Sequence, residues 1–389
     1  MSRPFSRTRN PGLPTGPGRA PGWMSISRGT AAGMALIYAM NLAEHLVFQT
    51  EIRRPWITQS DLLPAELSRV LLAVTIPALL LFAFRPNLPS IVRLAALVTI
   101  LLPGVFCVQS ILAVSEGVSE SVRYALLARP VGVLLMLAVA ATGVLTGSSP
   151  SVQGRSSWLA ILFAGLLTVI SFPLLLLHEA GFSAFSTDED ESRLVVVPAT
   201  EGEQSGRLSE QMQDRIRTAA EIVLRSEGGR LVMLRTQVNG QAPSAEELLQ
   251  TAVDSGLAAQ EVDVQEVSGD SVAALKLLVQ KSAAADKPLL VTHWYEVARF
   301  QRQTLRHCPE VRVRSALQRN AIMGQNLIVL RESQRLLQVL LEPLLRLAAT
   351  MRSPSETQLA DPYSAADTAA EPDDLSGLIE PVSEESTAE

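Results

Sequence analysis

The sequence is poor in cysteine and carries none of the common short signatures of catalysis. Its 389 residues include two cysteines, Cys107 and Cys308, and no Cys-x-x-Cys pair, which excludes a disulfide framework and a cysteine-built zinc site. It also lacks HExxH, GxSxG, GxxxxGK and GxGxxG, the motifs of metalloproteases, serine hydrolases, P-loop enzymes and dinucleotide-binding enzymes. His307 stands beside Cys308 without further ligands at metal-binding spacing, so we expect no metal site. Any other cofactor stays unknown.

An excess of basic charge is lacking as well. Lysine and arginine number 33 and aspartate and glutamate 39, which gives a net charge of −6, so we expect no nucleic-acid partner. Residues 1–28 are rich in Arg, Pro, Gly and Ser, lack the apolar segment of a secretory signal, and predict a disordered basic tail. Residues 349–389 are acidic and rich in Ser, Ala, Pro and Thr, and predict a disordered acidic tail.

Long apolar runs fill the first half of the sequence. Residues 158–177 form a run of twenty residues without one charge, enough for a helix to cross a hydrocarbon core of about 30 Å. Three further runs are also predominantly apolar: residues 70–84, 94–114 and 126–146. A fifth run, residues 30–48, contains Asn41, Glu44 and His45, so hydropathy alone leaves open whether it spans a membrane.

The charges between the runs favour five spans in a transmembrane region of residues 29–178. With five spans, the arginine-rich N-terminus and the loop at residues 85–93 share the cytoplasmic side, as the positive-inside rule requires. With four, that loop would face outward. Five spans place the C-terminal domain on the outer face of the membrane, with the lipid bilayer as a partner. Glu44 and His45 then lie within about one turn of the end of their span, where they would reach water.

After an acidic hinge at residues 179–192, short β-branched runs alternate with amphipathic helical segments. Strands are expected at residues 194–197, 230–234, 262–267, 288–292 and 311–313, and helices at 208–226, 243–255, 272–281, 295–307 and 327–347. Strands that alternate with helices of this length form βαβ units and a parallel sheet. The predicted fold is therefore an α-helical transmembrane bundle followed by a three-layer α/β domain, residues 193–348, with a mostly parallel, Rossmann-like sheet.

Three segments of the α/β region carry a family resemblance. A strand is followed by a helix with an arginine near its start, Arg207 or Arg215; then comes PSAEELLQTAVDSGL, and last LLVTHWYEVAR. In this order and spacing, residues 194–341 resemble the YdcF-like (SanA/ElyC-type) domain family of bacterial envelope proteins. The chemistry differs, because the glycine-rich turn after the first strand is missing and Glu296 occupies the family's histidine position. The chain thus resembles a degenerate member fused to a multi-span membrane region.

The resemblance implies a polar or phosphate-bearing ligand at the carboxyl ends of the strands, where parallel sheets bind ligands. The candidate ligand-binding residues are Thr292, Tyr295, Arg299, Ser244, Glu246, Asp270 and Ser271. The planar fork of Arg299 suits an anion. His293 titrates near neutral pH and is the candidate general base, with Glu296 as the alternative acid or base.

Three functions remain open at this point. The first is a multi-pass protein of the bacterial inner membrane that serves envelope or cell-wall biogenesis by binding a ligand or an envelope protein. The second is an enzyme, a hydrolase or transferase, that acts on a phosphate-bearing envelope lipid or a nucleotide-like substrate. The third is a non-catalytic membrane scaffold.

Overall fold

The computed structural model describes most of the chain between residues 22 and 352. The described ranges are 22–48, 65–85, 87–112, 120–147, 157–183, 192–199, 208–236, 243–267, 271–281, 288–316 and 326–352. The expected tails lie outside them, except that helix α1 (Gly22–Phe48) and helix α10 (Asn326–Arg352) extend into the ranges predicted for the tails. Most of the expected acidic hinge also lies outside the described residues.

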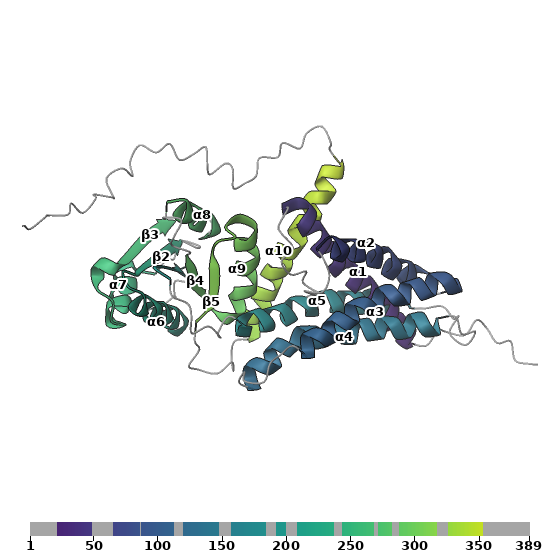
Figure 1. Ribbon diagram of the computed structural model, residues 1–389. Helices are drawn as coiled ribbons and strands as arrows, with labels where there is room; N and C mark the ends of the chain where they lie inside the picture. Colours follow the sequence, from purple (N-terminus) through teal and green to yellow (C-terminus); the bar gives the residue numbers. More distant parts are fainter. Residues whose placement is uncertain are drawn as a thin grey trace, which may run out of the picture.

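Five apolar helices form the first part of the molecule (Figure 1). After α1 these are α2 (Ala65–Phe84), α3 (Ser90–Leu112), α4 (Glu120–Thr146) and α5 (Trp158–Ser183). Four of them, α1, α3, α4 and α5, are long and apolar enough to cross a membrane, and α2 holds a shorter apolar stretch. Apolar side chains stay exposed along one side of α5, at Leu159, Leu162, Phe163, Leu166, Leu167 and Ile170. Such a stripe is typical of a helix that contacts lipid.

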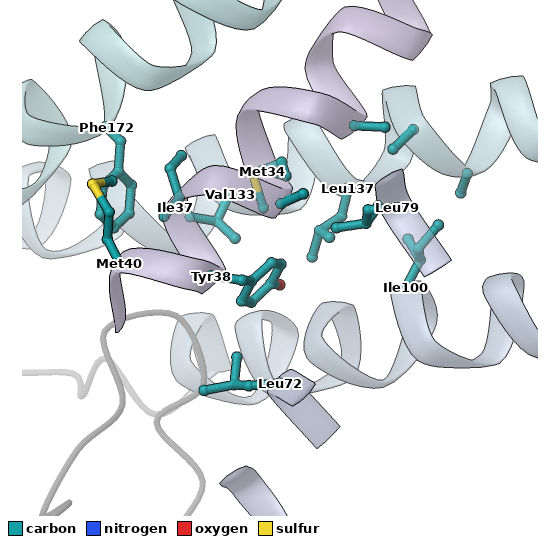
Figure 2. Close-up of a cluster of buried hydrophobic side chains, with 14 of the residues drawn as sticks. Met34, Ile37, Tyr38, Met40, Leu72, Leu79, Ile100, Val133, Leu137 and Phe172 are labelled. Atoms are coloured by element: carbon teal, nitrogen blue, oxygen red, sulfur yellow. The ribbon is translucent and has the colours of Figure 1, made fainter. Parts of the chain in front are cut away.

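The least apolar of the four, α1, is also the most enclosed. It contacts α2, α4 and α5 within the bundle. Of its membrane-length apolar stretch 56% is buried, against 39% for that of α5. Its neighbours are therefore mainly other helices, and Figure 2 shows its side chains among those of α2 to α5. Because protein surrounds α1, its polar residues need not face lipid, and hydropathy alone ranks it below the other helices.

Two glycines one turn apart bring α1 close to α5. A Cβ atom at Gly33 would lie 2.7 Å from the Cβ of Thr168 and 2.8 Å from the carbonyl oxygen of Gly165. A Cβ at Gly29 would likewise meet the backbone of α5. Small residues at this spacing are a common device of membrane helices, since they allow two backbones to approach. The contacts advance in the same direction along both helices, so α1 and α5 are parallel.

The bundle has two distinct ends. At one end, the Nε–H of Arg28 near the start of α1 donates to the carbonyl of Ala83 near the end of α2, over 2.7 Å. At the other end, Arg129 near the start of α4 forms an ion pair with Glu179 near the end of α5. Neighbouring helices in the chain therefore alternate in direction. After these five helices, the chain leaves the bundle at the end opposite to the start of α1.

The second part of the molecule is a three-layer α/β domain built on one parallel sheet. Its strands are β1 (Leu194–Ala199), β2 (Arg230–Thr236), β3 (Val262–Val267), β4 (Leu289–Thr292) and β5 (Arg312–Ser315). They lie in the order β3-β2-β1-β4-β5, and every neighbouring pair is parallel. The bundle and this sheet confirm the fold class expected from the sequence.

Helices cover both faces of the sheet. They are α6 (Glu210–Arg225), α7 (Ala245–Asp254), α8 (Ser271–Lys281) and α9 (Trp294–His307). Alternation along β1 shows the two layers: Val195 and Val197 pack in one core with side chains of α6 and α7. Leu194 and Val196 pack in the other core with side chains of α8 and α9. A strand buried on both faces reads as a continuous apolar run, as β1 does.

Candidate functional site at the strand tips

The strand order creates a switch point between β1 and β4. From β1 the chain moves outward to β2 and β3, and it then crosses back to add β4 and β5 on the other side of β1. In open parallel sheets, ligands bind beside the carboxyl ends of the two strands at which the order reverses. Here those ends are Ala199 of β1 and Thr292 of β4.

The junction between β4 and α9 brings together most of the predicted site residues. His293 is the N-cap of α9 in extended conformation (φ −72°, ψ 152°). One turn into the helix, Glu296 accepts a hydrogen bond of 2.5 Å from the Thr292 hydroxyl. An acidic side chain in the first helical turn also interacts favourably with the helix dipole. Tyr295 donates from its hydroxyl to Oε1 of Gln211 on α6, over 2.9 Å.

Behind this junction lies a chain of four charged side chains. Arg215 of α6 is fully buried and places Nη2 3.0 Å from Oε2 of Glu296. Arg299 places Nη2 3.2 Å from the other oxygen of Glu296, and its Nε donates to Glu332 of α10 over 2.9 Å. Both carboxylates thus face arginines within the protein, and Glu332 also pairs with the half-exposed Arg335. We call Arg215, Glu296, Arg299 and Glu332 the tip network.

The network fixes the protonation state of Glu296. Burial alone would raise the pKa of this carboxyl, but Arg215 and Arg299, together with the Thr292 hydroxyl, hold it at about 2. Glu296 is therefore a permanent carboxylate near neutral pH. A general acid needs a pKa near the working pH, so this geometry makes Glu296 a positioning anion. Arg215 also anchors β1, because its Nη1 donates to the carbonyl of Pro198 over 3.0 Å.

His293 stands apart from the tip network. Its side chain is fully buried and stacks on the Tyr295 ring at 5.1 Å between centroids. Among the described residues, neither ring nitrogen has a hydrogen-bond partner. Burial lowers the pKa of His293 well below its ordinary value, and Arg215 adds to the effect while Glu296 opposes it. His293 is thus a neutral imidazole at the switch point, with one nitrogen able to donate and the other able to accept.

Ser244, Glu246 and Ser271 are the other predicted site residues that the structure describes. Ser244 caps the start of α7 without a side-chain hydrogen bond, and both Ser244 and Glu246 are exposed. Asp270 lies outside the described residues, and Ser271 begins α8. The described part of the chain holds no group of three His, Cys, Asp or Glu side chains suited to a metal.

Sequence reasoning missed one member of the tip network and left another open. Glu332 comes 33 residues after Arg299, on a helix whose sequence gives no sign of the pairing. Arg215 was one of two candidates for the arginine at the helix start, and the other, Arg207, lies outside the described residues. The sequence did hold one indication of the pairing of Arg215. It lies on the core-facing side of its helix with Met212 and Ile216, and a buried arginine requires a partner.

The other face of α9 holds the α/β domain against the bundle. Near its start, Trp294 stacks on His178 of α5 with ring centroids 5.4 Å apart. A Cβ at Gly181 would lie 2.5 Å from the Trp294 carbonyl oxygen, so a glycine is required at this contact. Figure 1 shows α9 and α10 standing between the sheet and the bundle.

Near its end, α9 binds an acidic residue of α1 through two arginines. Glu44 lies 2.9 Å from Nε of Arg306 and 3.5 Å from Nη1 of Arg302. The sequence led us to expect Glu44 near water, and this was wrong: Glu44 is buried, because α9 covers the end of α1. Burial lowers the pKa of Arg302 to about 10, although Glu44 opposes the change. We call Glu44, Arg302 and Arg306 the arginine clamp.

Comparisons of this chain with family models, with curated proteins and with solved structures found no match.

Proposed function

We propose that this protein is a membrane-anchored binding protein of the bacterial envelope, in which a degenerate YdcF-like domain presents its strand tips beside the membrane. The observation that carries the proposal is the double role of α9. Its N-terminal end holds the candidate site residues His293, Tyr295 and Glu296. The same helix contacts the bundle through Trp294 and Arg306. A ligand or partner at the strand tips would therefore be held at a fixed place relative to the bilayer.

The tip network favours binding over catalysis. Arg299 already contacts two carboxylates, and Glu296 is a permanent carboxylate with all its described partners inside the protein. An anionic ligand would have to displace one of these internal contacts. Both ring nitrogens of His293 have unused hydrogen-bonding capacity toward the described residues of this junction. We therefore assign His293 the central place in ligand recognition.

A ligand screen on the full chain in lipid nanodiscs tests this proposal. The probes are nucleotides, sugar phosphates and isoprenoid phosphates, and the readout is the thermal unfolding midpoint. A probe at 100 times its Kd should stabilise the protein by about 2.7 kcal/mol. His293→Ala should abolish the shift, and His307→Ala, at the opposite end of α9, should preserve it. If no probe shifts the midpoint of the folded protein, a small-molecule site at the strand tips is refuted and the scaffold function takes its place.

The orientation belongs to the same proposal. Arg28, Arg85 and Arg93 lie at the end of the bundle remote from the α/β domain, and the positive-inside rule assigns that end to the cytoplasm. The α/β domain would then face the outer side of the inner membrane. With Cys107 and Cys308 both buried, introduced cysteines can report the topology. An impermeant maleimide should label Asp254→Cys in intact cells and Asn87→Cys only after permeabilisation, and the reverse pattern would invert the orientation.

A further inference from the structure

Helix α1 carries polar side chains on successive turns inside the bundle. Tyr38, Asn41 and Glu44 follow one another at intervals of three residues, and each is at most 1% exposed. With a rise of about 1.5 Å per residue, they extend over roughly 9 Å of the helix axis. Glu44 is held by the arginine clamp, so the outer member of this series has its charge compensated.

The two inner members have no such compensation. Among the residues that the structure describes, the Tyr38 hydroxyl and both polar atoms of the Asn41 amide lack hydrogen-bond partners. Figure 2 shows the Tyr38 ring among apolar side chains that come from other helices, including Leu72, Leu79 and Leu137. Buried amides and hydroxyls are rarely left unpaired, because each unpaired group costs about 1–3 kcal/mol. Three such atoms on adjacent turns of one helix point to a bound molecule.

We propose that Tyr38 and Asn41 form a binding site inside the bundle for a small neutral hydrogen-bonding molecule, either water or a molecule that carries a hydroxyl group. A phenol and an amide are both uncharged, and each can donate and accept. The nearest charged member of the series, Glu44, already faces two arginines. The site therefore supplies no charge for an ionic ligand, and it matches a hydroxyl group, which also donates and accepts. This site is independent of the strand tips.

The sign of a stability change tests the proposal on the full chain in nanodiscs. Tyr38→Phe removes one hydroxyl and adds no volume. If the hydroxyl holds a bound molecule, the variant should lower the unfolding midpoint by about 2–4 °C. If the hydroxyl has no partner, its removal relieves an unpaired buried group, and the midpoint should stay unchanged or rise, which overturns the proposal. Thr75→Val calibrates the assay, because the Thr75 hydroxyl is buried and donates to Leu71 over 2.7 Å.

A double-mutant cycle tests whether the two residues share one molecule. Tyr38→Phe and Asn41→Leu do not break a direct contact, because the two side chains are not bonded to each other. If one molecule bridges them, the double variant should lose less stability than the sum of the single variants. Strictly additive changes overturn the shared site. Should Asn41→Leu fail to fold, Asn41→Ser takes its place in the cycle.

Two measurements separate water from a larger hydroxyl-bearing molecule. Bound water allows hydroxyl radicals to modify Tyr38 although its side chain is fully buried. A bound lipid or other hydroxyl-bearing molecule should appear at one equivalent in solvent extracts analysed by mass spectrometry, and it should be lost from Asn41→Leu. Either result supports the site and names its occupant. The absence of both overturns it.

Discussion

The buried pair of Arg215 and Glu296 gives the sharpest prediction for stability. Glu296→Gln keeps the size of the side chain and the acceptor for the Thr292 hydroxyl, but it leaves the Arg215 charge without a carboxylate. Arg215 is 0% exposed, so water cannot replace the lost partner. Removing one partner of a buried ion pair typically costs about 3–5 kcal/mol, a large fraction of the roughly 5–15 kcal/mol that stabilises a folded domain.

The chain offers a matched control in the pair of Arg235 and Glu266, because Glu266 is 69% exposed. Glu266→Gln should cost at most about 1 kcal/mol, since water screens exposed pairs. Urea unfolding of the full chain in detergent, followed by circular dichroism, compares the two variants. The double variant Arg215→Met/Glu296→Leu should recover most of the loss, because it removes both buried charges. Equal costs for Glu296→Gln and Glu266→Gln would refute the buried pair.

Three further predictions concern His293 and the packing of the bundle. Burial lowers the pKa of His293 in the folded state, so its contribution to stability is present above the unfolded pKa of about 6.5 and is lost as the pH falls below that value. Between pH 7.5 and 5.5, the free energy of unfolding should fall by up to about 1.4 kcal/mol more in the wild type than in His293→Phe. Equal pH dependence would contradict the assignment. Gly33→Ala should lower the unfolding midpoint far more than Gly104→Ala, whose Cβ would meet no neighbour closer than 3.7 Å. Similar midpoints would argue against the close approach of α1 and α5. Glu44→Gln should increase protease cleavage between the bundle and the α/β domain, because Arg302 and Arg306 lose the carboxylate of α1, although Arg306 keeps its ion pair with Glu342 of α10. An unchanged digestion pattern would show that the clamp does not hold the two parts together.

Periodicity predicted the elements of the α/β domain closely. The run at residues 262–267 coincides with β3, and the runs before it and after it match their strands to within about two residues at each end. Short buried strands between amphipathic helices have strong local patterns, so local reasoning succeeds there. The helix expected at residues 295–307 begins one residue earlier, at Trp294, and ends at His307 as predicted.

The pairings of charged residues could not be predicted in the same way. Glu44 lies in an apolar run near its end, and only the distant α9 determines that it is buried. Arg299 has Glu296 one turn away, at a spacing where opposite charges can pair on a helix, but its second partner, Glu332, belongs to another helix. The tip network and the arginine clamp are both products of tertiary packing. Sequence spacing within a single element carries no information on such contacts.

The arginine clamp has a consequence for biogenesis. Glu44 and Arg306 are separated by 262 positions in the chain, and α10, which also contacts α1, follows later still. During synthesis α1 is complete long before the helices that enclose its polar side chains. We therefore expect nascent chains to depend on insertion factors or chaperones that shield α1 until translation reaches α10. Chains that stop short of α9 would keep Glu44 uncompensated and should be recognised as unfinished by membrane quality-control proteases.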